Sequence, residues 1–296
     1  MDQVTVRAVY LGIQGEDSKD VLQGLPFLKD VNLGKKVKVG KKVVVIGGGN
    51  VAMDVALTAK RLGAQVSMVC LEGSKEEMPA YDDEIDQAKE EGIKIEMGWG
   101  PTTILGGKKK VTGVDFKCCT SVFDKDGKFC PMYDESKTKS IDADMVITAI
   151  GQATDLSFIQ EENMFDITPG GTIKADSGSL STNIPGIFVG GDAARGPARM
   201  IDAIADGKKA AKAIDYYLQC EDLPPEADPI PLADIETQTF KFHLRDTAKE
   251  DRYESSCLPG KERAGNFNEV NKAFDKETCI KEARRCISCR CTAMPY

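Results

Sequence analysis

The stretch KKVVVIGGGNVAMDVALTAKRLG, residues 41–63, decides the fold of this chain. Its first part, residues 43–46, is a continuous β-branched run, the pattern of a strand that is buried on both faces of a parallel sheet. Three glycines follow, and apolar residues then recur at helical spacing until Gly63 ends the helix. A second strand, predicted over residues 65–71, ends at Glu72. A strand, glycine turn, helix and strand within about 30 residues predict an α/β fold with a Rossmann-like domain.

The glycine turn fits the G-x-G-x-x-A pattern of dinucleotide-binding folds. Its residues are Gly47, Gly48, Gly49, Asn50, Val51 and Ala52. In this pattern the first glycine permits a tight turn, the third lets the backbone approach a pyrophosphate, and the alanine lets the helix pack closely on the strand. The alternative is a glycine-rich turn with a structural role only. We expect residues 47–51 to bind a pyridine dinucleotide.

Glu72 ends the second predicted strand, roughly 20 residues after the turn, near the spacing expected for the acid that binds the adenosine ribose. A carboxylate there accepts hydrogen bonds from ribose hydroxyls and repels a 2′-phosphate. The sequence therefore predicts NAD(H) as the cofactor, with NADP(H) less favoured. The alternative is an ordinary solvated loop carboxylate. Lys75, three residues further on, leaves the choice between NAD(H) and NADP(H) open.

Composition excludes several other classes of function. The net charge is −8, from 39 Lys and Arg against 47 Asp and Glu, which argues against nucleic acid or an anionic membrane as the main partner. A single histidine, His243, argues against a His-rich zinc site. No apolar run is long enough for a transmembrane helix, and residues 1–7 lack the features of a signal peptide. We expect a cytoplasmic protein.

Ten cysteines are present, and four of them cluster at the end of the chain: Cys279, Cys286, Cys289 and Cys291. In a reducing compartment such clustering indicates metal or redox chemistry rather than disulfides. A helix would place Cys279 and Cys286 on one face. Four thiolates suit an iron–sulfur cluster, which we expect as [4Fe–4S], although tetrahedral zinc and unligated thiols stay open. The other six cysteines are interpreted mainly as small buried residues.

Further elements follow from local patterns. Strands are expected over residues 94–99, 110–117 and 144–150, with a hairpin turn at 125–128. After Gly151 another buried strand is expected over 187–189, then Gly190-Gly191-Asp192 and a helix over 200–218. Asp192 suits a carboxylate close to a polyol or ribose, or simply a helix cap. A Pro-rich acidic linker covers 221–229, an irregular region follows, and a last helix starts at 276, capped by Asp275.

Four stretches together resemble a known family: residues 41–54 (KKVVVIGGGNVAMD), 77–80 (EMPA), 148–151 (TAIG) and 186–192 (GIFVGGD). They resemble flavoprotein oxidoreductases like the glutamate synthase small subunit, and the large subunit of electron-bifurcating ferredoxin–NADP transhydrogenases is similar. The resemblance covers roughly residues 4–218. It implies an FAD domain into which an NAD(P)H domain is inserted, often together with iron–sulfur clusters.

Mapped onto this chain, the resemblance implies four segments: residues 1–34 and 151–220 as two parts of a partial FAD domain, 35–150 as the NAD(P)H domain, and 221–296 as a linker with an irregular or helical Cys-rich tail. It also implies further cofactor-binding residues. Gly191 and Asp192 match positions at the flavin's ribityl chain, Met200 and Ile201 match the helix start beside the isoalloxazine ring, and Gly151 belongs to the same set.

This sequence also departs from the family. The first Gly-rich motif, which holds the FAD pyrophosphate, is absent, so we expect only half an FAD site and weak or no FAD binding by these residues alone. The missing half would come from elsewhere in a longer chain or from other subunits. NADPH-using members tend to carry arginines where this chain has Leu71-Glu72. Residues 282–289 resemble a cluster-binding sequence that relatives carry at their N-terminus.

The resulting hypothesis is an NADH-dependent flavin and iron–sulfur oxidoreductase, or its pyridine-nucleotide module. Hydride would pass from nicotinamide to flavin, and electrons onward to a cluster and a partner protein. No side chain is nominated as catalytic, because the cofactors carry the chemistry. One alternative is a non-catalytic nucleotide-binding or cluster-bearing subunit of a larger electron-transfer complex. Another is an NAD-binding regulatory module.

Overall fold

The structure is a computed structural model that describes residues 6–108, 110–157, 159, 164–222 and 251–284. The chain divides into two compact units, one of residues 1–225 with 264–266 and one of 226–263 with 267–296. Each unit is described by itself below. In the part of the chain that the structure describes, no helix is both long and apolar enough to cross a lipid bilayer.

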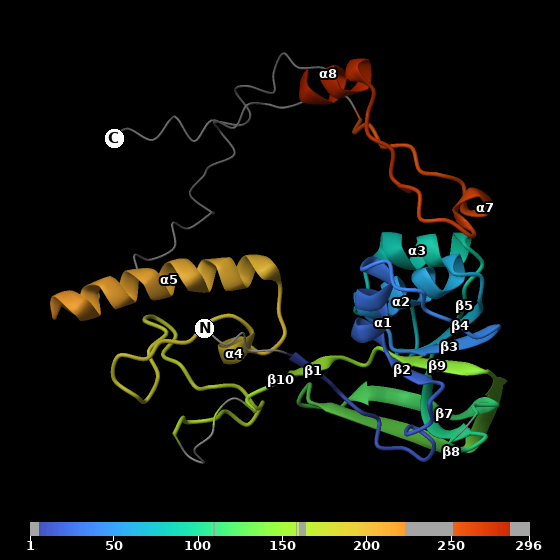
Figure 1. Ribbon diagram of the computed structural model, residues 1–296, viewed down its shortest axis with the longest axis horizontal. Helices are drawn as coiled ribbons and strands as arrows, with labels where there is room; N and C mark the ends of the chain where they lie inside the picture. Colours follow the sequence, from blue (N-terminus) through green and yellow to red (C-terminus); the bar gives the residue numbers. More distant parts are fainter. Residues whose placement is uncertain (1–5, 109, 158, 160–163, 223–250, 285–296) are drawn as a thin grey trace. The chain divides into compact units, whose positions relative to one another are not determined.

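The centre of the first unit is a five-stranded parallel sheet with the order β2-β9-β3-β4-β5 (Figure 1). The strands are β2 (Val21–Gln23), β9 (Met145–Thr148), β3 (Lys42–Ile46), β4 (Gln65–Val69) and β5 (Lys94–Glu96). The chain runs from β3 to β4 on one side and returns to β9 on the other side of β3. A topological switch point therefore lies at the carboxyl end of β3, where α/β sheets bind their ligands.

Two different layers cover the two faces of this sheet (Figure 1). One layer consists of the helices α1 (Gly24–Asn32), α2 (Asn50–Arg61) and α3 (Asp82–Glu90). The other is an antiparallel sheet of β6 (Trp99–Leu105), β7 (Gly113–Phe123) and β8 (Phe129–Asp142). Successive side chains of β3 alternate between the layers: Val43 and Val45 pack into the helical core, whereas Val44 and Ile46 pack into the core beneath the second sheet.

Helix α2 forms where the apolar spacing predicts it. Its alanines and valines, including Ala52 and Val55, are fully buried against the sheet. A partly buried ion pair joins its last turn to the end of α3, because Arg61 donates to Glu91 with Nη2 and Oε1 2.6 Å apart. Gly63 adopts a φ of +99°, which suits the stop after the helix. The predicted strand–turn–helix–strand unit is confirmed.

Other expectations are confirmed with shifted boundaries. The strand expected over residues 65–71 is shorter, and the one expected over 94–99 divides into β5 and the start of β6. The hairpin turn at 125–128 is present, with Gly127 at a φ of +75° between β7 and β8. The central sheet also starts earlier than the domain boundary expected at residue 35, because β2 pairs with β9 in the same sheet.

The other segments of the first unit contain a two-stranded antiparallel sheet, β1 (Val6–Ala8) with β10 (Gln152–Thr154), and the helices α4 (Asp192–Arg195) and α5 (Met200–Gln219). Helix α5 confirms the helix expected over residues 200–218. The strand expected over 187–189 is wrong: among the described residues it forms only an isolated bridge, between Phe188 and Ser181. An apolar run becomes a strand only when a neighbour supplies a ladder of hydrogen bonds, and this run has one bridge instead.

In the second unit the described residues include the short helices α7 (Gly260–Arg263) and α8 (Lys276–Arg284). The expected cap of α8 is confirmed, because the Asp275 carboxylate accepts a hydrogen bond from the backbone N–H of Thr278, at 2.7 Å. This hydrogen bond, together with those that Asp275 forms with neighbouring groups, lowers the pKa of its carboxyl. Cys257 forms an isolated bridge with Asn271.

Candidate functional site

A cleft of about 720 Å³ opens at the carboxyl ends of β3, β4 and β9. The glycine turn, residues 47–49, forms its floor, and residues 69–72 and 149–151 flank the turn on its two sides. The segment 9–13 and one face of β8 complete the walls. The cleft brings together seven of the residues that the sequence nominated: Gly47, Gly48, Gly49, Asn50, Val51, Glu72 and Gly151.

The glycine turn is closely packed where the sequence expects it to be. Gly47 has a φ of +142°, and a Cβ at this position would collide with the carbonyl oxygen of Ala149. A Cβ on Gly48 would collide with the carboxylate of Glu72. At Gly49, in contrast, the nearest neighbour of a Cβ would be Pro79, at 3.9 Å. The first two glycines therefore serve packing, and the third leaves open space at the cleft floor.

Helix α2 begins at this open space without a side-chain cap. Gly49 is its N-cap residue and supplies no side-chain hydrogen bond. The Asn50 carboxamide oxygen instead accepts a hydrogen bond from the backbone N–H of Tyr81, at 2.9 Å. Because the first amides of a helix lack partners within the helix and carry its positive dipole end, this helix start is suited to an anion.

Glu72 lines the cleft, and one of its carboxylate oxygens, which lies against Gly48, has no hydrogen-bond partner in the part of the chain that the structure describes. Its Oε2 is buried and accepts no hydrogen bond from any described residue. The loop that carries it is held firmly, because the Glu72 carbonyl accepts a hydrogen bond from the backbone N–H of Gly98, at 2.7 Å. A buried carboxylate oxygen without a donor costs free energy, so this site fits a ligand that brings hydroxyl donors.

Glu72 is the dominant charge of the cleft. No lysine or arginine occurs among the described residues that line it. Among the described residues that line the cleft, Cys70 is the only thiol, and burial, reinforced by the Glu72 carboxylate, raises its pKa to about 12. Lys75 does not reach the cleft lining; its ammonium pairs with Asp86 at 2.8 Å and with Asp82 at 3.4 Å.

Sequence reasoning missed the aromatic wall of the cleft. Phe129, Pro131 and Tyr133 lie on one face of β8, and Trp99 and Tyr10 also contribute to the lining. The continuous apolar and aromatic run over residues 129–133, directly after the hairpin turn at 125–128, was the available signal. The strand's length and its pairing with β7 indicate the face, but only the tertiary structure shows that this face borders the glycine turn.

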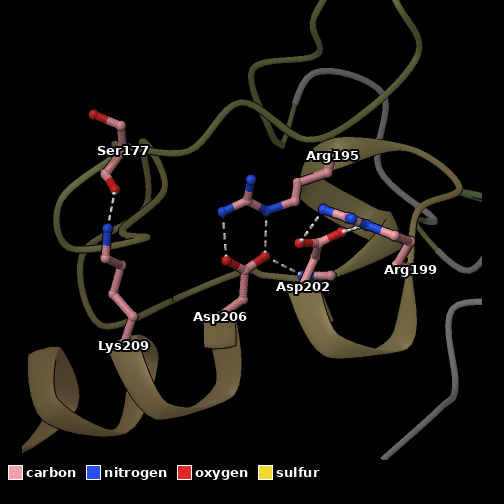
Figure 2. A network of polar contacts seen from close by, with 7 residues as sticks. Ser177, Arg195, Arg199, Asp202, Asp206 and Lys209 are labelled. Carbon is pink, nitrogen blue, oxygen red and sulfur yellow. Dashed lines mark hydrogen bonds and ion pairs between the residues drawn. The ribbon is translucent and has the colours of Figure 1, made fainter. Parts of the chain in front are cut away.

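A network of polar contacts fixes the turn Gly190-Gly191-Asp192 (Figure 2). Asp206 on α5 is buried and accepts hydrogen bonds from Nε and Nη2 of Arg195, each at 2.6 Å, and from the backbone N–H of Gly191, at 2.8 Å. The Arg195 guanidinium, together with the Gly191 amide, holds the pKa of this carboxyl below its usual range. Gly191 has a φ of +61° with ψ −148°, a conformation that glycine adopts readily and residues with a Cβ rarely do.

We expect Asp206→Ala to loosen this turn. The Gly191 amide loses its buried acceptor, which costs about 1–3 kcal/mol, and amide hydrogen exchange over residues 190–196 should accelerate roughly 5- to 150-fold at pH 7. The contribution depends on ionised Asp206. Since the folded-state pKa is lowered, the difference from wild type is full above pH 4 and shrinks as the pH falls through the lowered pKa.

Asp202→Ala is the matched control, one turn earlier on the same helix, since its exposed pair with Arg199 does not hold the 190–192 turn. We expect exchange over residues 190–196 to stay unchanged in this variant. Equal acceleration in both variants would contradict a specific role of Asp206.

The remaining nominated residues lie away from the cleft lining. Asp192 begins α4, and its Oδ1 accepts a hydrogen bond from the backbone N–H of Ala198, at 3.3 Å. Met200 and Ile201, at the start of α5, expose 80% and 61% of their surface. This exposure leaves their apolar side chains open to a further apolar group. The exposure of Met200 and Ile201 is compatible with the flavin contacts that the resemblance implies, and those contacts stay a prediction.

Only one of the four clustered cysteines lies among the residues that the structure describes. Cys279 is exposed on α8, whereas Cys286, Cys289 and Cys291 lie outside the described residues. Within the described ranges no group of three or more His, Cys, Asp or Glu side chains is arranged to hold a metal ion. The cluster ligands therefore stay a prediction.

Comparison with known proteins identifies the family. The model of the pyridine nucleotide-disulphide oxidoreductases matches residues 6–207. The chain belongs to this family. Its members use FAD and a pyridine nucleotide, and the unpartnered Glu72 oxygen and the open helix start at Gly49 fit a dinucleotide in this chain.

Curated relatives are longer proteins. The β subunit of an NADP⁺-dependent formate dehydrogenase from Moorella thermoacetica is 32% identical over 94% of this chain and 40% of its own length. The β subunit of an NADPH-Fe(3+) oxidoreductase from Geobacter sulfurreducens is 33% identical over 97% of this chain and 47% of its own. The small chain of an NADPH glutamate synthase from Azospirillum brasilense is 36% identical over 64% and 39%. This chain thus spans less than half the length of these relatives.

Solved structures support the fold. The thioredoxin reductase of T. acidophilum matches with a TM-score of 0.55 at 25% identity, over 73% of this chain and 63% of that one. FprA from Mycobacterium tuberculosis, in complex with NADPH, matches with a TM-score of 0.58 at 16% identity, over 75% and 65%. The α/β architecture expected from the sequence, an FAD/NAD(P) type of fold, is confirmed.

Proposed function

We propose that this chain is the pyridine-nucleotide module of a flavin- and iron–sulfur-dependent oxidoreductase, with NADH as its preferred nucleotide. The observation that carries the proposal is the pairing, in one cleft, of an uncapped helix start with an unpartnered buried carboxylate oxygen at Glu72. The first suits a pyrophosphate and the second suits ribose hydroxyls.

The preference for NADH rests on charge. A 2′-phosphate at the adenosine ribose would meet the Glu72 carboxylate, and no lysine or arginine among the described lining residues would compensate it. Lys75, the nearby candidate, is already paired with Asp86 and Asp82. The relatives named above carry NADP⁺ or NADPH in their names. The preference for NADH that we propose for this chain rests instead on the residues of its own cleft.

In this proposal the chain binds and orients rather than donating or accepting protons. The glycine turn holds the pyrophosphate, and Gly151, at the other side of the turn, leaves space on the nicotinamide side. Residues Gly191, Asp192, Met200 and Ile201 supply one half of a flavin site, which the rest of the FAD domain completes. When bound, the flavin supplies a hydride acceptor and passes on single electrons.

Downstream of the flavin we propose a [4Fe–4S] cluster on the four C-terminal cysteines and an electron-accepting partner protein. The division into FAD segments, an NAD(P)H domain and a cluster segment belongs to the same proposal. One observation supports a multi-subunit setting: the relatives in formate dehydrogenase and NADPH-Fe(3+) oxidoreductase are named as subunits.

Glu72→Ser tests the nucleotide preference. A hydrogen bond to a charged group contributes about 1.5–3 kcal/mol, so the variant should bind NADH roughly 10- to 100-fold more weakly. Its affinity for NADPH should stay the same or rise, because the repulsion is removed. Isothermal titration calorimetry with both nucleotides measures the ratio.

Glu76→Ser is the matched control, since Glu76 is exposed in the same loop and does not line the cleft. This variant should keep the wild-type ratio. A wild-type protein that binds both nucleotides equally, or a ratio that Glu72→Ser leaves unchanged, would contradict the assigned role of Glu72.

A further inference from the structure

The aromatic wall of the cleft, defined as Phe129, Pro131 and Tyr133, is a surface that the fold does not use for its own core. All three residues lie two positions apart on β8 and line the cleft, while Met132, between Pro131 and Tyr133, does not line it. Phe129 exposes 60% of its surface and Tyr133 37%, and neither belongs to the two hydrophobic cores. Large apolar side chains that are exposed together beside a polar turn indicate a bound partner.

Backbone hydrogen bonds and strand pairing connect the aromatic wall to Glu72. The Gly98 N–H donates to the Glu72 carbonyl, the Cys119 N–H donates to the Gly98 carbonyl at 2.8 Å, and Cys119 is the strand partner of Tyr133. Tyr133 also packs over Gly100 beside Leu71, since a Cβ on Gly100 would collide with the tyrosine ring and lie 3.0 Å from Leu71. The wall thus borders the residues that precede and carry the ribose-binding carboxylate.

Sheet order determines which end of a dinucleotide this wall meets. Strands β4 and β9 flank β3 on opposite sides, so Glu72 and Gly151 lie on opposite sides of the glycine turn. With the pyrophosphate at the turn and the adenosine ribose at Glu72, the base attached to that ribose would lie on the Glu72 side of the turn, where Leu71 and the aromatic wall also line the cleft. The nicotinamide extends toward Gly151.

We propose that the aromatic wall binds the adenine ring of the dinucleotide, with Tyr133 as its principal contact. This inference rests on the proposed function, because it places the adenosine ribose at Glu72. Adenine is a flat aromatic group that stacks on aromatic side chains, and base–aromatic stacking alone accounts for roughly 5- to 150-fold in affinity. The three-stranded sheet that stands where a crossover helix is usual therefore also contributes to ligand binding.

Tyr133→Ala tests the assignment with fragments of the ligand. The variant should bind NADH and ADP-ribose roughly 5- to 150-fold more weakly than wild type, with both affinities reduced by a similar factor. Its affinity for nicotinamide mononucleotide should be unchanged. Tyr133→Phe keeps the ring and should bind all three within about twofold of wild type. Met132→Ala, at an exposed residue of the same strand that does not line the cleft, should have no effect.

Two further measurements keep the test independent of the stability of Tyr133→Ala. Phe129→Ala removes a 60% exposed ring and should weaken NADH and ADP-ribose but not the mononucleotide. In the wild-type protein the single tryptophan, Trp99, lines the cleft, so ADP-ribose should change its fluorescence. Unchanged ADP-ribose affinity in both alanine variants, or a loss confined to the mononucleotide, would overturn the inference. Wild-type protein that binds none of the three ligands would instead refute the proposed function on which it rests.

Discussion

Gly49→Ala is expected to weaken NADH binding about 30- to 100-fold while leaving the fold intact. The space around Gly49 is open, with Pro79 as the nearest neighbour of an added methyl group, at 3.9 Å. The methyl group therefore fits the protein but occupies the position where a pyrophosphate approaches the start of α2. Loss of charge-assisted hydrogen bonds to the pyrophosphate, about 2–3 kcal/mol, gives the expected factor. Calorimetric titration with NADH and urea unfolding of the same sample measure both effects.

Gly47→Ala provides the contrast within the same turn. It places a side chain against the carbonyl oxygen of Ala149 at a φ of +142°, so it should lower the free energy of unfolding by about 1–3 kcal/mol. Gly49→Ala should lower it by less than about 1 kcal/mol, the cost of a poorer N-cap. If Gly49→Ala binds NADH as tightly as wild type, the helix start is not the pyrophosphate site.

Cys286→Ser and Cys289→Ser are each expected to remove the bound iron from the chain. Anaerobically purified wild-type protein should carry about four irons and about four acid-labile sulfides per chain, the content of one [4Fe–4S] cluster. Arg284, Arg285 and Arg290 lie beside these cysteines in the sequence and would compensate the negative charge of a thiolate-ligated cluster. Iron, sulfide and zinc analysis, with reduction followed by EPR, measures the outcome.

Cys220→Ser is the control, because Cys220 is an exposed cysteine at the end of α5, outside the C-terminal group. It should retain the full iron content. One zinc per chain without acid-labile sulfide would replace the redox role of this group with a structural one, and the chain would then be a nucleotide module only.

The part of the fold that sequence predicts best is the part whose causes are local. Residues 43–63 contain the buried strand, the glycines and the helical spacing in one short stretch, so their conformations follow with little help from the rest of the chain. The same holds for the hairpin turn at 125–128 and for the Asp275 cap. Glu72 lines the cleft because it follows the carboxyl end of β4 closely, although β4 is shorter than expected, and its contact with a ribose stays a prediction.

What sequence could not predict depends on distant partners. Strand β2 joins the central sheet by pairing with β9, more than 120 residues later in the chain. The sequence of its three residues does not indicate that β9 is the neighbouring strand. The run 187–189 has the composition of a buried strand, but it forms only a bridge with Ser181 among the described residues. The aromatic wall was missed for the same reason, since its role comes from β7 pairing and from the contact of Tyr133 with Gly100.

The most direct test of the central claim is a calorimetric titration of the wild-type chain with NADH and, in parallel, with NADPH. The account predicts one NADH site per chain and an affinity for NADPH that is at least about tenfold weaker, since a 2′-phosphate would face Glu72 in a cleft whose described lining holds no lysine or arginine. Absence of saturable NADH binding, or tighter binding of NADPH than of NADH, would contradict it.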